Sequence, residues 1–169
     1  MTTATLAKNK PAARQEIRVR RSVAVRRTVR ELYAFWHDLP NIPRILSHLK
    51  AVTVTGADTS HWIARTQVGG QKEWNVRINE DPNERWLAWS SEPDGDVETS
   101  GLVSFNPGSD PHETLVTVSL SFAPATGTMN ELLAALFAKD PGQQVAEDLE
   151  VFRSFMEHYS VAESLGRHA

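Results

Sequence analysis

The segment Pro141–Tyr159, with the sequence PGQQVAEDLEVFRSFMEHY, is the clearest indication of how this chain folds. Asp140 precedes it as a typical helix N-cap, and Pro141 fits the first helical turn. One continuous apolar stripe follows at helical spacing, formed by Val145, Leu149, Phe152 and Met156. The segment therefore predicts a helix about 28 Å long, which is enough to lie across a whole sheet.

Two earlier helix starts are marked by capping boxes, in which a threonine and a glutamate each satisfy a free backbone N–H. Thr28–Glu31 begins a helix that should stop before Pro40, and Thr128–Glu131 begins a helix over 129–138. Residues 41–49 predict a further short helix, which forms a helical hairpin with the first. The helices therefore fall into an early pair and a late pair.

Strands are predicted where apolar and polar residues alternate, because successive side chains of a strand point to opposite faces. The alternation starts at Ile17 and recurs in six later runs, Ala51–Thr55, Ser60–Val68, Lys72–Asn79, Arg85–Ser91, Val97–Phe105 and Leu115–Phe122. Arg21 breaks the first alternation, which indicates a bulge or a strand edge, with an inward-pointing guanidinium as the alternative. Most of the intervening turns are short, so neighbouring strands should be antiparallel.

The order of elements predicts an α+β fold of the form β-α-α-β6-α. A curved antiparallel sheet of about seven strands would wrap round the long C-terminal helix and leave a hollow between them. We expect a single ligand-binding domain over residues 16–160, a disordered basic leader over 1–15 and a flexible tail over 161–169.

The composition excludes several kinds of site and partner. None of the 169 residues is a cysteine, so disulfides, thiolate metal sites and cysteine nucleophiles are excluded. No apolar run is long enough for a membrane span, and residues 1–15 lack the apolar stretch of a signal peptide. We therefore expect a cytoplasmic protein.

Charge is distributed unevenly along the chain. Residues 1–30 carry nine Lys and Arg against one acid, and residues 31–169 carry nine against twenty. A basic arm can hold nucleic acid or an anionic membrane surface. Alternatively, the leader is solvated and Arg18, Arg20 and Arg26 form the outer face of a strand. We favour this alternative and expect no nucleic-acid partner, because no aromatic residues interleave with the charges.

Several short sequence motifs accompany this order of elements. They are Phe35-Trp36 followed by Leu39-Pro40-Asn41, Ser60-His61-Trp62, Glu73-Trp74, Ala88-Trp89-Ser90-Ser91, Gly101-Leu102-Val103-Ser104-Phe105, and Asp140-Pro141-Gly142-Gln143-Gln144-Val145 leading to Glu147-Asp148-Leu149. Over residues 16–158 the chain resembles the START-related helix-grip superfamily, often labelled SRPBCC, and within it the bacterial branch labelled polyketide cyclase/dehydrase-like. The resemblance implies a helix-grip fold and an apolar small-molecule ligand, and catalysis in only some members.

Strand parity indicates which side chains face the long helix. The inner positions are mostly aromatic or aliphatic, which is typical of a ligand pocket and equally of a core filled by its own tryptophans. The resemblance favours an open cavity. Thr66 and Thr99 would supply orienting hydrogen bonds. The candidate ligand-binding residues are Trp62, Thr66, Trp74, Trp89, Thr99, Phe105, Val118, Phe152 and Met156.

The sequence gives less indication of a catalytic or metal site. The inner strand positions include no carboxylate and the six histidines form no close pair, so we assign no catalytic residue, metal or cofactor. His48, expected at the end of the second short helix, could act at a cavity mouth, although a surface histidine is the simpler interpretation. His61 could form a polar cluster with Glu73 and Arg77 across adjacent strands, and its parity places it on the outer face.

Three functions stay open. The preferred one is binding of an apolar or aromatic small molecule that is lipid-like or polyketide-like. The second is a polyketide cyclase or dehydratase enzyme, and the third is an interaction module that uses the basic arm and the apolar helix 129–138. That helix, flanked by Gly127 and Gly142, could be a lid, could pack on the sheet, or could contact a second subunit of a homodimer.

Overall fold

The computed structural model describes residues 16–158, so the predicted leader, the predicted tail and Tyr159 lie outside the described residues. Seven strands form one antiparallel sheet in the order β1-β7-β6-β5-β4-β3-β2. The strands are β1 (Ile17–Val25), β2 (Leu49–Val54), β3 (Thr59–Arg65), β4 (Gln71–Glu80), β5 (Trp86–Ser91), β6 (Val97–Pro107) and β7 (Thr114–Pro124). The predicted α+β architecture and its antiparallel sheet are confirmed.

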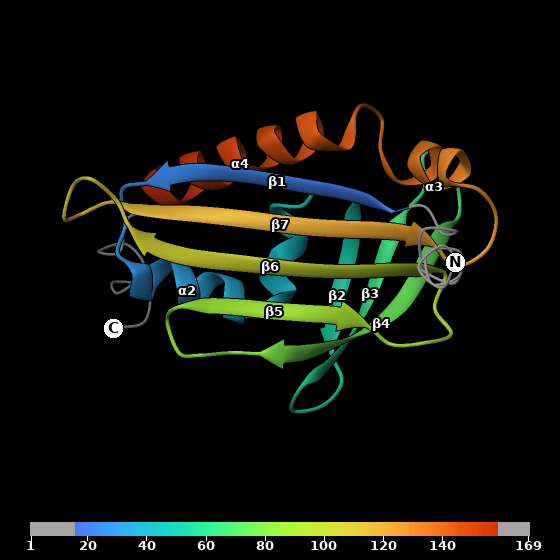
Figure 1. Ribbon diagram of the computed structural model, residues 1–169, viewed down its shortest axis with the longest axis horizontal. Helices are drawn as coiled ribbons and strands as arrows, with labels where there is room; N and C mark the ends of the chain where they lie inside the picture. Colours follow the sequence, from blue (N-terminus) through green and yellow to red (C-terminus); the bar gives the residue numbers. More distant parts are fainter. Residues whose placement is uncertain (1–15, 159–169) are drawn as a thin grey trace, which may run out of the picture.

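Helices cover one face of this sheet. They are α2 (Val29–His37), the 3-10 helix η2 (Leu39–Arg44), α3 (Met129–Leu136) and α4 (Pro141–His158). In Figure 1 β1, β7, β6 and β5 cross the front of the molecule, α2 lies behind them, and α4 runs along β1. The long helix therefore lies nearest to β1, with its apolar stripe in the core that the inner face of the sheet shares.

The predicted helix starts are confirmed by their hydrogen bonds. Both capping boxes are complete, at Thr28 with Glu31 and at Thr128 with Glu131. The predicted helix over 41–49 is wrong in type and extent, because the structure has a 3-10 helix that ends at Arg44. Pro40 and Pro43 both lie in η2, and proline has no N–H to donate to an α-helical ladder.

Strand parity was predicted correctly for most inner positions. Along β6 buried residues alternate with more exposed ones, and the predicted inner residues of β7 are all buried, although Thr117 and Ala123 on its other face are buried too. In β5 Trp89 is buried while Trp86 is half-exposed. The prediction fails at the end of β3, which stops at Arg65. Thr66 and Val68 fall in the following turn, where the hydroxyl of Thr66 donates to the carbonyl of Gly69.

Arg21 occupies the inner register of β1 opposite Val118, and the β1–β7 pairing continues past it without a bulge. The strand-edge interpretation of Arg21 therefore holds, and the bulge is wrong. A Cβ on Gly142 would lie 2.3 Å from Nη2 of Arg21, so the guanidinium lies directly against the start of α4. Glycine at position 142 lets the edge strand and the helix approach this closely.

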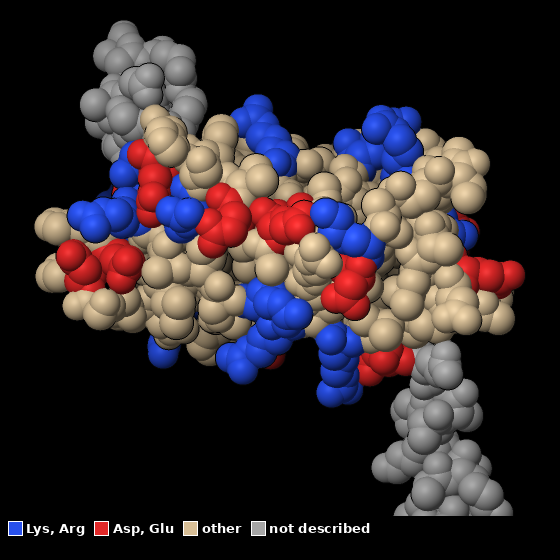
Figure 2. Space-filling model, turned by 90° about the horizontal axis from the view of Figure 1, so that it is seen from above, with Lys and Arg blue, Asp and Glu red and all other residues tan. Residues whose placement is uncertain are grey.

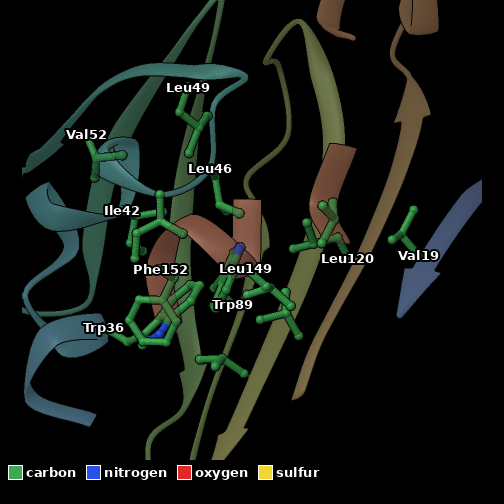
Figure 3. Packing of buried hydrophobic residues seen from close by; sticks show 14 of the residues in the cluster. Val19, Trp36, Ile42, Leu46, Leu49, Val52, Trp89, Leu120, Leu149 and Phe152 are labelled. Atoms are coloured by element: carbon green, nitrogen blue, oxygen red, sulfur yellow. The ribbon is translucent and has the colours of Figure 1, made fainter. Parts of the chain in front are cut away.

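Every layer contributes to one core (Figure 3). Apart from Leu46, which lies between η2 and β2, the labelled side chains come from α2 (Trp36), η2 (Ile42), β1, β2, β5, β7 and α4. Trp36 meets Phe152 edge to face, with ring centroids 5.6 Å apart. Trp89 lies against Gly101 of the neighbouring strand, since a Cβ on Gly101 would come within 2.2 Å of Cζ2 of the indole.

We expect Gly101→Ala to destabilise the fold by about 1–3 kcal/mol, because the added methyl would overlap the buried indole of Trp89. Urea denaturation followed by tryptophan fluorescence measures this change. Ser100→Ala, one position away on the outer face, is the matched control and should change stability by less than about 0.5 kcal/mol. Equal stabilities of the two variants would contradict the contact.

Candidate functional site

The interior between the sheet and α4 collects nearly all of the predicted ligand-binding residues. Trp62, Trp74, Trp89, Phe105, Val118, Phe152, Met156 and Thr99 are buried there. Thr66 is the exception, because its hydroxyl is used inside the β3–β4 turn and it belongs to no strand. Contact of the other eight residues with a ligand stays a prediction.

Three tryptophans from adjacent strands form an aromatic wall. Trp62 lies opposite Trp74 in the β3–β4 register, and its ring centroid is 5.8 Å from that of Trp89. Nε1 of Trp62 donates to Oγ of the buried Ser60 at 2.8 Å. Nε1 of Trp74 is buried and has no hydrogen-bond partner among residues 16–158, and the same holds for Nε1 of Trp36. The interior thus contains N–H donors that no protein group within that range satisfies.

His48 is a buried titratable group that the sequence interpretation placed on the surface. It lies in the turn between η2 and β2 and is only 6% exposed. Its ring packs between Phe122 and Phe137, at centroid distances of 5.5 and 5.3 Å. Burial lowers the pKa of His48 to about 4, so the imidazole is neutral at pH 7. Its Nδ1 has no partner among the described residues.

Asp148 is a second buried group, which the strand-based reasoning missed. This carboxylate of α4 is 4% exposed, and burial raises its pKa. Its Oδ2 accepts from the backbone N–H of Ser47 at 3.1 Å and from the Ser47 hydroxyl at 3.2 Å. The spacing could have revealed it, since position 148 lies three residues after Val145 and four before Phe152, on the helix stripe.

Polar groups on the outer face form a separate cluster. His61 bonds through Nε2 to Glu73 and through Nδ1 to Asn75, both at 2.8 Å, and these hydrogen bonds raise its pKa. The predicted cluster of His61 and Glu73 is confirmed, but Arg77 pairs with Glu92 instead, at 3.2 Å. Within residues 16–158 no three His, Asp or Glu side chains gather closely enough to hold a metal ion.

Two hollows open on the outer face. One, of about 770 Å³, lies at the β5–β6 turn and is lined by acidic and hydroxyl side chains such as Glu92, Glu98 and Ser100. The other, of about 440 Å³, lies over β1, β7, β6 and β5 beside Arg18 and Arg20. Both arginines are exposed, as expected for the outer side of a strand. The face seen from above in Figure 2 mixes acidic and basic side chains.

The helix α3 packs on the sheet with Met129, Leu132 and Leu136 buried, so the packing interpretation of this apolar helix is confirmed. Its C-terminal end is held by a hydrogen bond from the backbone N–H of Gln67 to the carbonyl of Ala135, at 2.8 Å. The next residue after the helix, Phe137, contacts His48 and Phe122. The α3 end of the interior is therefore closed by an aromatic group.

A curved antiparallel sheet of seven strands with a long C-terminal helix and a buried aromatic interior defines a helix-grip protein of the START-like class. A family model described as polyketide cyclase / dehydrase and lipid transport matches residues 25–150, and the chain belongs to this family. No curated protein matches the chain. Within residues 16–158 no helix is long and apolar enough to cross a membrane.

Solved structures agree with this assignment. A protein from Deinococcus radiodurans is 29% identical with a TM-score of 0.72, over 85% of this chain and 99% of that one. A START superfamily protein from Mycobacterium smegmatis is 15% identical with a TM-score of 0.64, over 82% and 98% of the two chains. An aromatase/cyclase from a Streptomyces species is 19% identical with a TM-score of 0.52, over 81% and 84%. The last two similarities show the fold alone.

We expect His48 to make folding stability dependent on pH. The unfolded chain takes up a proton on this histidine near pH 6.5 and the folded chain only near pH 4, so stability is lost as the pH falls through that range. Between pH 7.5 and 5, the wild type should lose about 2 kcal/mol more than His48→Phe does. Urea denaturation at the two pH values measures this difference, and an equal loss in both proteins would contradict it.

Proposed function

We propose that this protein binds an uncharged, oxygen-bearing apolar or aromatic small molecule between the sheet and α4. The observation that carries the proposal is that three buried polar atoms of aromatic and imidazole rings have no hydrogen-bond partner among residues 16–158, namely Nε1 of Trp36, Nε1 of Trp74 and Nδ1 of His48. An unsatisfied buried polar group costs about 1–3 kcal/mol. A ligand that supplies hydrogen bonds here would remove that cost.

The surroundings of these atoms favour a neutral ligand. The interior walls are aromatic and aliphatic, and no Lys or Arg among residues 16–158 is a buried residue, although Nε of the half-buried Arg27 is itself enclosed. The one buried carboxylate in that range, Asp148, already accepts hydrogen bonds from Ser47 and Gln144. Burying a charged ligand without a counter-ion would be strongly unfavourable. The indole N–H groups are donors only, so the ligand should carry carbonyl, ether or hydroxyl oxygens as acceptors. Aromatic rings suit the tryptophan wall, because they can stack on it.

Access would be through the α3 end of the interior. Phe137 lies in the connection between α3 and α4, and its phenyl ring packs against the imidazole of His48. Gly127, with φ of 83°, lies directly before α3, where a change of backbone angle could move that helix. The same opening would expose the buried Nδ1 of His48 to an entering molecule.

A second candidate function is cyclisation or dehydration of a polyketide-like substrate, which the family description favours. Such an enzyme needs a titratable group inside the cavity. His48 is a titratable group in that position. Its buried ring is neutral at pH 7 and could accept a proton, and its Nδ1, which has no partner among residues 16–158, can donate or accept a hydrogen bond according to its tautomer. Catalysis would also require the interior to hold the flexible polyketide-like substrate in a reactive conformation.

The ligand-binding proposal predicts a specific role for the indole N–H of Trp74. Trp74→Phe keeps an aromatic ring but removes the donor, so affinity for the neutral fluorescent ketone Prodan should fall about fivefold. Displacement of Prodan by 2-ethylnaphthalene, which has no oxygen, should give the same affinity for the hydrocarbon in wild type and variant. Fluorescence titration measures both.

Trp86→Phe is the matched control, because Trp86 is half-exposed on the outer face and donates to Glu80 at 2.8 Å. It should leave Prodan affinity within about twofold of the wild type. Val118→Trp, which adds an indole inside the interior, should abolish Prodan binding while circular dichroism verifies the fold. Unchanged affinity in both Trp74→Phe and a folded Val118→Trp would refute the interior site.

A further inference from the structure

We propose that Asp148 is a positioning residue, which holds the Ser47–His48 turn so that the imidazole faces the interior binding site. This inference rests on the proposed function, since it assigns His48 to the polar lining of that site. It concerns a carboxylate on α4 and a turn about one hundred positions earlier in the chain, which the fold brings into contact.

The turn itself is short. The backbone N–H of Leu49 donates to the carbonyl of Leu46 at 3.0 Å, which closes a four-residue turn with Ser47 and His48 at its centre. Oδ2 of Asp148 accepts from both the N–H and the hydroxyl of Ser47. One carboxylate oxygen therefore binds the residue directly before His48 through two donors.

A third polar side chain completes the connection. Nε2 of Gln144, one helical turn earlier on α4, donates to Oγ of Ser47 at 2.8 Å and to Oδ1 of Asp148 at 3.2 Å. Both oxygens of the buried carboxylate are thus engaged with uncharged donors. Hydrogen bonds to a charged acceptor are stronger than those between neutral groups. The network therefore fixes the turn to the helix that forms the other side of the interior.

On its other side the imidazole meets only apolar rings. Phe122 of β7 and Phe137 after α3 contact it. This aromatic packing restricts the imidazole ring of His48 but does not determine the backbone conformation of the turn that carries it. The hydrogen bonds from Ser47 to Asp148 determine that conformation, because they fix the residue directly before His48. Without them the turn could rotate and expose the imidazole to solvent.

Asp148→Leu is the decisive variant, since leucine fills a similar volume and offers no acceptor to Ser47. We expect the pKa of His48, followed by NMR titration, to rise from about 4 toward the usual 6.5 as the ring becomes solvated. Prodan affinity should fall about tenfold. Asp148→Asn keeps an acceptor for the Ser47 N–H and should restore both values to near those of the wild type.

Glu147→Leu is the matched control, because Glu147 precedes Asp148 on α4 but points to solvent and pairs with Lys139 at 2.8 Å. It should leave both readouts unchanged. If Asp148→Leu does not fold, Ser47→Pro deletes the same N–H from the turn, at a position where proline is compatible with a β-turn. The same two readouts then apply to that variant.

The outcomes separate this inference from the proposed function. If wild-type protein does not bind Prodan, the interior site is refuted, whereas the NMR titration of His48 still reports on the turn. A His48 pKa that stays near 4 in Asp148→Leu would overturn the positioning role, as would an equal loss of affinity in Glu147→Leu. A raised pKa together with weaker binding that Asp148→Asn restores would establish it.

Discussion

The contact between the apolar stripe of α4 and the inner face of the sheet is the constraint on which the rest of the structure depends. Leu149 and Phe152 are almost completely buried, and Phe152 meets Trp36 of α2, so one helix joins the first and last parts of the fold. Burial of apolar side chains of this size stabilises a fold by about 1.5–3 kcal/mol each. The same helix carries Asp148. One element therefore supplies both the apolar packing of the core and the carboxylate that is proposed to position the Ser47–His48 turn.

Much of this fold could be predicted from residue patterns, because period-two alternation is a direct consequence of strand geometry. The inner positions of β4, β6 and β7 followed from that rule alone. The end of β3 did not, because Thr66 continues the alternation in the sequence. In the structure Gly69 and Gly70 adopt φ values of 92° and 82°, and the chain turns before Thr66 can join the sheet. Alternation does not report where a turn begins.

The polar part of the candidate site was harder to predict for a different reason. His48 follows a helix whose length was overestimated, and its burial depends on Phe122 and Phe137, which are about 75 and 90 positions away in the sequence. The spacing of Asp148 places it on the apolar stripe of α4, but a carboxylate is seldom buried without a partner, so its burial could be predicted only with that partner known. Its partner Ser47 lies in another part of the chain. Long-range pairing of this kind leaves no local periodicity.

The two outer hollows measure about 770 and 440 Å³, yet they are weaker candidates for a ligand site. Their lining groups, such as Ser100, Arg20 and Glu92, are at least partly exposed and can bond to water at little cost. A ligand would have to displace that water and replace its hydrogen bonds. In the interior the balance is reversed, because Nε1 of Trp74 and Nδ1 of His48 are buried without a partner among residues 16–158. There each hydrogen bond offered by a ligand would recover a cost already incurred on folding, and this asymmetry places the proposed binding site between the sheet and α4.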